Sequence, residues 1–372
     1  MTSTRHASLS RHHRVGLFVL AGTVAALYGA VAVAVLAPET PGRPAGGVLS
    51  TGLSSPVPAL RYDVVSTRPG GSASHGSETR IIRPAVMSRL LFGAPSTRDA
   101  IAGLPEAPHV EAPSVAEARA LYDDLGYRLA HVADGRMGVP RVYLAAVPED
   151  LASLRDVDAR KSVFLRTVLP LVLRVNEEIA ADRARVERIE AHRRAGGGIG
   201  PEDEAWLADR AAWYKLETVD IPALLARMDV LPPSLALAQA AEESGWGTSR
   251  FAREGNALFG QWTTDPGVKG LVPLARADDA THRVRAFDRL LDAVRAYARN
   301  LNTHPAYAEL RAARRAARAA GEPVDGEALA ATLHSYSERG QDYVDTLLLI
   351  MRANKLATLD RVRLGTQVAR GS

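Results

Sequence analysis

A long run with helical periodicity, residues 156–193, most constrains what this chain can fold into. Its apolar residues recur at three-, four- and seven-residue spacings while charged residues fill the other positions, which is typical of a helix with one buried face. That apolar stripe comprises Val172, Val175, Ile179, Val186 and Ile189. Pro170 indicates a kink or a helix start inside the run. A helix of this length needs other elements to cover its apolar face, so the sequence predicts a mainly helical protein.

Further helices are expected on both sides of this run. Ser114 is a good N-cap for an expected helix over residues 115–130, and PRVYLAAVP is a short extended piece. Beyond a glycine-rich hinge at 195–204, whose glycines lack the spacing of a phosphate-binding loop, the expected helices are 201–216, 222–228, 233–243, 288–301, 305–320, 327–336 and 341–353. Between them, residues 263–286 contain short β-like pieces and predict a small hairpin.

The N-terminal region has the features of a membrane segment. Residues 1–14 carry Arg5, Arg11 and Arg14 and no acid, and residues 15–36 then run for 22 residues without a charge. At ~1.5 Å per residue, a helix of that length spans the ~30 Å hydrocarbon core of a bilayer, and the basic flank predicts an N-in topology. The alternative is a signal peptide cleaved near Ala30-Val31-Ala32. Both interpretations place the rest of the chain outside the cytoplasmic membrane, in the periplasm or cell envelope.

The remaining chain divides by composition. Residues 38–110 are rich in Pro, Gly and Ser and show no sustained period, so they predict a flexible tether. The predicted organisation is a membrane segment (1–37), this tether (38–110), a helical region (111–200), a helical domain (201–358) that carries the candidate site, and a tail (359–372).

Composition excludes several classes of function. The net charge of +4 comes from arginines interleaved with acids, which is no nucleic-acid footprint. The chain has no cysteine, which excludes a cysteine nucleophile, a Cys-zinc cluster and disulfides. His282, His304 and His334 are widely spaced and form no HExxH-like pair, so we expect neither a metal nor an organic cofactor.

The segment AQAAEESGWGTSRFAREGNALFG, residues 238–260, reads as a site. Glu242 and Glu243 end a helix of small residues, where the negative end of the helix dipole and apolar burial both raise the pKa of a carboxyl group. An acid that stays protonated near neutral pH is what cleavage of a glycosidic bond requires. Glu243, directly before Ser-Gly-Trp-Gly, is the candidate acid, and Glu242 is interpreted as a solvated helix-end residue.

Aromatic and amide side chains near this segment are candidate binding residues. The indole rings of Trp246 and Trp262 suit stacking on sugar rings; buried core tryptophan is the alternative, and the flanking glycines favour the groove. Asn256 is either a turn residue or a hydrogen-bond donor to a sugar. Tyr336 and Tyr343, in HSYSERGQDYV, can steady positive charge at an anomeric centre, although composition alone favours a packed aromatic pair.

These motifs, AQAAEESGWGTSRF, GNALFGQW, LNTHPAY and YSERGQDYV, resemble the glucosaminidase domain of glycoside hydrolase family 73, and most of all its Bax-type bacterial envelope proteins. The resemblance covers roughly residues 140–356. It implies a lysozyme-like, mostly helical fold with a small β-hairpin lobe, and hydrolysis of β-1,4 bonds after N-acetylglucosamine in peptidoglycan. It also implies that Glu243 is the general acid. Tyr336 matches the tyrosine of the family's Tyr-Ala-Thr-Asp motif, more loosely because the following residues differ.

The chain departs from the family in the hairpin lobe, where many members carry a second acid. Residues 268–287 contain no Glu, and Asp278 and Asp279 are the candidate acids there, besides the framing Asp265. Either one of them supplies the base, or the acetamido group of the substrate assists, or the domain does not catalyse. The expected partners are peptidoglycan glycan strands and the cytoplasmic membrane. The alternatives to a hydrolase are a peptidoglycan-binding scaffold and a metal-dependent amidase that uses the histidines.

Overall fold

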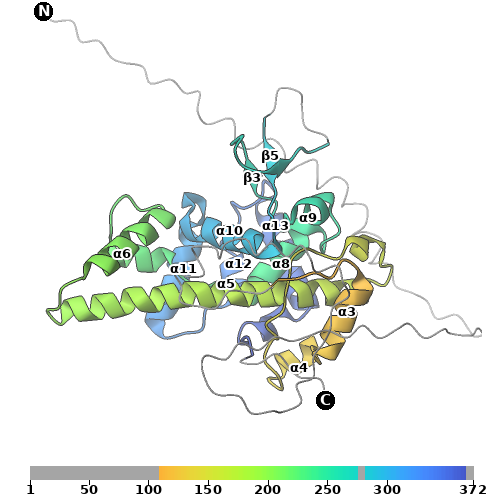
Figure 1. Ribbon diagram of the computed structural model, residues 1–372, viewed down its shortest axis with the longest axis horizontal. Helices are drawn as coiled ribbons and strands as arrows, with labels where there is room; N and C mark the ends of the chain where they lie inside the picture. Colours follow the sequence, from red (N-terminus) through yellow and green to blue (C-terminus); the bar gives the residue numbers. More distant parts are fainter. Residues whose placement is uncertain (1–108, 275–280, 366–372) are drawn as a thin grey trace, which may run out of the picture.

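The protein is described by a computed structural model over residues 109–274 and 281–365, which form the mainly helical body in Figure 1. In chain order its elements are β1 (His109–Val110), α3 (Val115–Asp124), α4 (Leu129–Ala133), β2 (Tyr143–Leu144), η3 (Glu149–Ser153), α5 (Val157–Arg194), α6 (Pro201–Trp213), α7 (Ile221–Arg227), α8 (Pro233–Ser244), α9 (Arg250–Gly255), β3 (Trp262–Thr263), β4 (Gly270–Leu271), β5 (Arg283–Arg285), α10 (Leu290–Thr303), η4 (Pro305–Tyr307), α11 (Ala308–Ala320), α12 (Gly326–Ala330), α13 (Gln341–Ala353) and η5 (Leu356–Leu359). The predicted helical class is confirmed.

The long helix α5 runs along the longest axis of the molecule (Figure 1). Asp156 caps its start by accepting a hydrogen bond from the Ala159 amide at 3.0 Å, and basic residues fill its last turn. All five residues of the predicted apolar stripe are buried. Pro170 lies inside the continuous helix and does not start one. Its neighbours Leu169 and Leu171 are both fully buried, and this burial offsets the ~3 kcal/mol that an internal proline costs.

The central helix α8 is buried on every side over residues 233–241. It contacts α5, α12, α13 and η5. A helix that is apolar all round must lie inside a protein, and the alanines of α8 let four neighbouring elements approach closely. The C-terminal end of α8, which carries Glu242 and Glu243, is therefore held by packing from several directions.

The small sheet contains three antiparallel strands in the order β3-β5-β4, where the sequence predicted a two-stranded hairpin. Val284 of the central strand pairs with Trp262 on one side and with Leu271 on the other. The additional strand begins at Trp262, one residue before the segment that the sequence assigned to the hairpin. Figure 1 shows the sheet projecting from the helical body near α9. A helical body with a small sheet lobe fits the expected lysozyme-like domain.

A short strand precedes Ser114. Strand β1 pairs in parallel with β2, and His109 lies opposite Tyr143. The predicted N-cap is confirmed, because Ser114 and Glu117 form a reciprocal capping box at the start of α3. The helix ends sooner than the sequence suggested, since Gly126 adopts a φ of 60° and α4 is a separate helix.

The predicted helix 327–336 is wrong in its second half. Only α12 is helical there, and the chain then turns repeatedly up to Gly340, whose φ is 54°. The sequence SYSERG has no apolar period that would hold a helix against the core. As a result, Tyr336 and Arg339 lie on a compact loop between α12 and α13.

Helices from the two predicted regions, 111–200 and 201–358, pack into one hydrophobic core. Figure 1 shows α5 lying alongside the helices of the second region, and α5 contacts α8 and α10. Within residues 109–274 and 281–365, no helix combines the length and apolarity that crossing a membrane requires. The predicted membrane segment, 15–36, lies outside these residues and stays a prediction.

Replacing Asp229 should strongly destabilise the fold. Asp229 is buried and contacts three arginines, among them the fully buried Arg314 at 3.4 Å and Arg318. Removing the carboxylate leaves buried guanidinium charge without compensation, which costs about 3 kcal/mol or more. Chemical denaturation of Asp229→Ala measures the loss. Asp134→Ala, which breaks the exposed pair with Arg136, is the matched control and should cost less than about 1 kcal/mol. Equal losses in the two variants would contradict this account.

Candidate functional site

The Ser-Gly-Trp-Gly segment ends α8 in a fixed turn. The Ser244 hydroxyl donates to the Ala240 carbonyl at 2.5 Å and accepts from the Gly247 amide at 2.8 Å. Gly245 and Trp246 both have left-handed φ values, 57° and 58°. A Cβ on Gly247 would lie 2.9 Å from the Phe164 ring of α5, so only glycine fits. The motif therefore fixes the helix end that carries Glu243.

Glu243 is the acid whose surroundings favour the protonated form. Burial raises the pKa of its carboxyl group from 4.5 to about 7. A hydrogen bond with the Tyr343 hydroxyl lowers this pKa, the Glu242 charge raises it and the Arg339 charge lowers it, in decreasing order of effect. Near neutral pH, a substantial fraction of Glu243 can therefore donate a proton.

Aromatic side chains pack around this carboxyl group. Tyr336 and Tyr343 stack with ring centroids 5.5 Å apart and planes 4° apart. The Tyr336 hydroxyl donates to the Phe259 carbonyl at 3.2 Å, and Phe259 stacks on Tyr297. The structure thus brings Glu243 together with Tyr336 and Tyr343, which lie far from it in the sequence.

The GNALFG segment closes the other side of the acid. A Cβ on Gly260 would lie 3.1 Å from Oε2 of Glu243, so the backbone comes very close to the carboxylate. Asn256 anchors the start of this segment in a left-handed conformation, and its amide donates to the carbonyls of Phe287 and Asp288. Its Oδ1 is buried and has no hydrogen-bond partner within the part of the chain that the structure describes. The predicted hydrogen bond from Asn256 to a sugar needs an N–H donor, and that nitrogen already donates to these two carbonyls.

The two candidate tryptophans differ in their surroundings. Trp246 is half-buried, edge-on to Phe164 at 5.8 Å and under the Lys161 ammonium at 5.1 Å, so it faces α5. Trp262 is 45% exposed on β3, and its ring stacks on His282 with centroids 4.3 Å apart. Trp262 therefore offers an open aromatic face, whereas the contacts of Trp246 are with the core.

Tyr343 is only 1% exposed. This burial is at odds with the predicted direct contact with substrate and makes Tyr343 a neighbour of Glu243 inside the protein. The predicted second acids, Asp278 and Asp279, lie outside the described residues. Within 109–274 and 281–365, no group of three or more His, Asp or Glu side chains is arranged to hold a metal ion.

Sequence reasoning missed Gln239 and Arg339. Gln239 is fully buried one turn before Glu243, and the only signal was a polar residue in an otherwise apolar stretch of helix. Arg339 forms an ion pair with Glu242 at 2.6 Å, which ties the loop that carries Tyr336 to the end of α8. Glu242 is therefore a paired residue beside the acid and not a solvated one.

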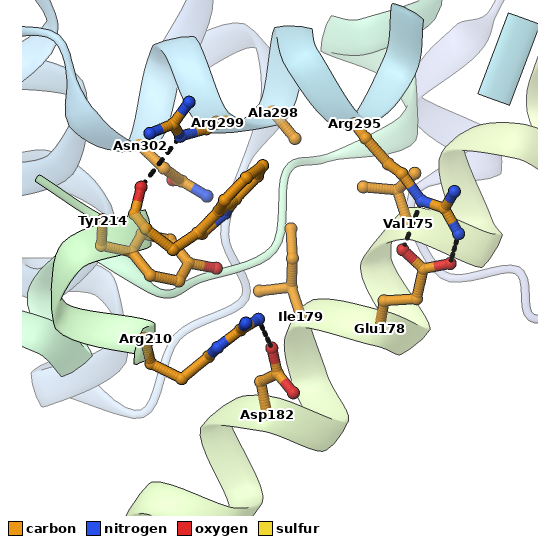
Figure 2. A pocket seen from close by; sticks show the side chains of 11 residues that line it. Val175, Glu178, Ile179, Asp182, Arg210, Tyr214, Arg295, Ala298, Arg299 and Asn302 are labelled. Atoms are coloured by element: carbon orange, nitrogen blue, oxygen red, sulfur yellow. Dashed lines mark hydrogen bonds and ion pairs between the residues drawn. The ribbon is translucent and has the colours of Figure 1, made fainter. Parts of the chain in front are cut away.

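A hollow lies between α5, α6 and α10, and its lining does not include Glu243, Tyr336 or Arg339 (Figure 2). Its walls contain two buried ion pairs, Asp182–Arg210 at 3.3 Å and Glu178–Arg295 at 2.6 Å. Each carboxylate faces an arginine, and the third arginine of the lining, Arg299, donates to the Trp213 carbonyl at 2.8 Å. Such pairs position helices against each other without marking a reactive site.

Glu243→Gln should be more stable than the wild type, and this difference in unfolding free energy should grow as the pH rises from about 4.5 to about 7. The native carboxyl titrates near pH 7 and the unfolded one near 4.5, so the native state binds more protons and stability falls with increasing pH across this window. Above pH 7 the wild type bears the whole penalty, at most ~3 kcal/mol, which the amide lacks. Unfolding free energies at about pH 4 and pH 8 measure the gap between variant and wild type. A gap that does not grow with pH would contradict the raised pKa.

Comparison with known proteins gives the family of this chain. Residues 221–356 match the Glucosaminidase family, described as mannosyl-glycoprotein endo-beta-N-acetylglucosaminidase. Protein bax of Escherichia coli (strain K12) is 35% identical over 215 residues, which cover 55% of this chain and 74% of that protein. No solved structure matches significantly. Glu243, Trp262 and Tyr336 all fall in the matched range, and the chain belongs to the Bax-type proteins, which carry a glucosaminidase domain of the glycoside hydrolase family 73 type.

Proposed function

We propose that this protein hydrolyses β-1,4 glycosidic bonds after N-acetylglucosamine in peptidoglycan, with Glu243 as the general acid. The observation that carries the proposal is the Glu243 carboxyl, whose pKa burial raises to about 7 at the end of a rigid helix. A glycosidase needs an acid that is protonated at working pH and still able to release its proton.

In the proposed reaction, Glu243 transfers its proton to the glycosidic oxygen as the bond from that oxygen to the anomeric carbon breaks. The bonding electrons stay with the leaving oxygen, and positive charge develops on the sugar that remains. Tyr336 lies near the acid, since after burial the Glu243 charge is the next largest cause of the raised pKa of its hydroxyl. We expect its electron-rich ring and hydroxyl oxygen to steady that positive charge.

Trp262 is the proposed stacking surface for a sugar ring. Its exposed face is supported by His282, which stacks on the indole ring and keeps it on the sheet lobe. The flat apolar face of a pyranose covers such a ring well, so we expect Trp262 to contribute to binding more than to the chemical step.

The proposed mechanism has three candidates for the group that activates the attacking water. They are Asp278, Asp279 and the acetamido group of the substrate. An aspartate base would act on water directly, whereas the acetamido group would attack the anomeric carbon before water enters. Analysis of the anomeric configuration of fresh products separates inversion from retention.

We propose further that residues 15–36 anchor the chain in the cytoplasmic membrane and that the tether lets the domain reach glycan strands in the envelope. The uncharged run and its basic flank support the anchor. Cleavage of this segment as a signal peptide would instead release the domain. The mass of the mature protein from membrane and soluble fractions distinguishes the two.

Two alternatives to the hydrolase function are considered on specific observations. A peptidoglycan-binding scaffold is favoured by the absence of a Glu from residues 268–287, and it predicts glycan binding without new reducing ends. A metal-dependent amidase would use His282, His304 and His334. His304 accepts a hydrogen bond at the start of η4, and His334 faces Glu309 at 3.8 Å, on separate elements. Full activity in EDTA would eliminate the amidase.

Glu243→Gln should lower glycan cleavage by at least ~100-fold, because a positioned general acid contributes 10²–10⁴-fold. Mass analysis of digested sacculi measures the loss and identifies the bond that is cut. Glu242→Gln is the matched neighbour, and it should retain activity within about tenfold, since its carboxylate is paired with Arg339. Wild-type cleavage by the Glu243 variant would show that the assigned mechanism is wrong.

A further inference from the structure

Three buried side chains from three helices form a hydrogen-bonded chain that ends at the acid. The Tyr297 hydroxyl of α10 donates to Oε1 of Gln239 at 2.7 Å, and Nε2 of Gln239 donates to the Tyr343 hydroxyl of α13 at 3.0 Å. Gln239, Tyr297 and Tyr343 are each at most 1% exposed. The Tyr343 hydroxyl in turn lies within hydrogen-bonding reach of the Glu243 carboxyl.

The chain has a direction. Because Tyr297 donates to Oε1 of Gln239, that amide presents its N–H to Tyr343. The Tyr343 oxygen accepts this bond, so its own hydrogen is available only for another acceptor. The carboxyl group of Glu243 is that acceptor. With the amide reversed, Oε1 of Gln239 would compete for the same hydrogen, and Glu243 would lose its donor.

We propose that Gln239 is a positioning residue for the reaction, which holds the Tyr343 hydroxyl as a hydrogen-bond donor to Glu243. This inference rests on the proposed function, in which Glu243 releases a proton. When it does, a carboxylate is left in a closely packed place where an anion without a donor is costly. A donor that is already oriented strengthens its hydrogen bond as the negative charge develops and needs no reorganisation at that moment.

The other groups that face Glu243 do not replace this donor. Glu242 lies beside it on α8, and the guanidinium of Arg339 is engaged with Glu242, so these two charges oppose each other. The Tyr336 hydroxyl is directed to the Phe259 carbonyl. Tyr297 and Tyr307 also lie within electrostatic reach of Glu243, but the Tyr297 hydroxyl donates to Gln239 and the Tyr307 hydroxyl is hydrogen-bonded with Asn300.

The test measures the pH at which activity is lost on the basic side of the profile of kcat/KM, which reports the pKa of the acid in the free enzyme. Gln239→Met keeps the side-chain volume but removes both hydrogen bonds. Tyr343→Phe removes the donor itself. Each should move the basic limb upward by about one unit and lower kcat about tenfold, because the carboxylate loses a charge-assisted hydrogen bond.

A double-mutant cycle separates positioning from general damage. If Gln239 acts through Tyr343, then Gln239→Met should not move the basic limb further in the Tyr343→Phe background. Tyr122→Phe is the matched control: it removes another buried hydroxyl, which hydrogen-bonds to Thr167 at 2.8 Å, and should leave the limb in place. An unmoved limb in Gln239→Met, or a further shift in the double variant, would overturn the proposal.

Two further measurements keep the inference testable. If Gln239→Met does not fold, Tyr297→Phe removes the donor that orients the amide while its ring still stacks on Phe259. It should move the limb in the same direction, and an unmoved limb counts against the proposal. If the wild type cleaves no glycan, the proposed function fails, and the pH dependence of unfolding takes over as the readout. The Gln239 and Tyr297 variants should extend the loss of stability to higher pH, and Glu243→Gln should abolish this difference.

Discussion

The burial of the Glu243 carboxyl at the end of α8 is the constraint on which the candidate site depends. The helix is buried on every side over residues 233–241, so its end lies where an ion is poorly solvated. Ser244 and the glycines on either side of Trp246 then turn the chain away at once, which leaves Glu243 as the last long side chain at that end. The packing that stabilises the helix is thus also the packing that makes its terminal acid protonated near neutral pH.

The long helix α5 contributes to the site without supplying a reacting group. Phe164 lies against both Gly247 and the edge of the Trp246 indole, and Leu151, just before α5, closes the same contact. The turn after Glu243 is therefore built on residues from the upstream region. This gives residues 111–200 a physical role that their sequence pattern did not reveal: they support the turn that positions the acid.

What could be predicted from the sequence was local in the chain. The N-cap at Ser114, the buried stripe of α5 and the position of Glu243 at a helix end each depend on residues that are close together in the sequence. Partners that are distant in sequence could not be found this way. Gln239 and Tyr343 are 104 positions apart, and Glu242 and Arg339 are 97 apart, so no spacing rule connects them.

Contacts with residues distant in sequence also distinguish the two tryptophans. In the sequence they look alike, because each is flanked by glycine or by a polar turn. Trp246 meets a helix that begins far upstream, whereas Trp262 begins an exposed strand, and only tertiary packing separates these outcomes. The two-stranded hairpin was an incomplete prediction for the same reason. The strand that starts at Trp262 is recognised by its pairing with Val284 and not by any alternation of its own.

The pKa of Glu243 depends more on uncharged influences than on the charged residues around it. Glu242 and Arg339 act on the Glu243 pKa in opposite directions and are paired with each other at 2.6 Å, so most of their net effect cancels. Burial and the Tyr343 hydrogen bond are the larger influences, and neither carries a net charge. Dissolved salt screens interactions between exposed charges far more than it changes burial or a buried hydrogen bond. The strength of this acid is therefore a property of the fold, set by α8, α13 and Gln239 between them, more than of the ionic surroundings.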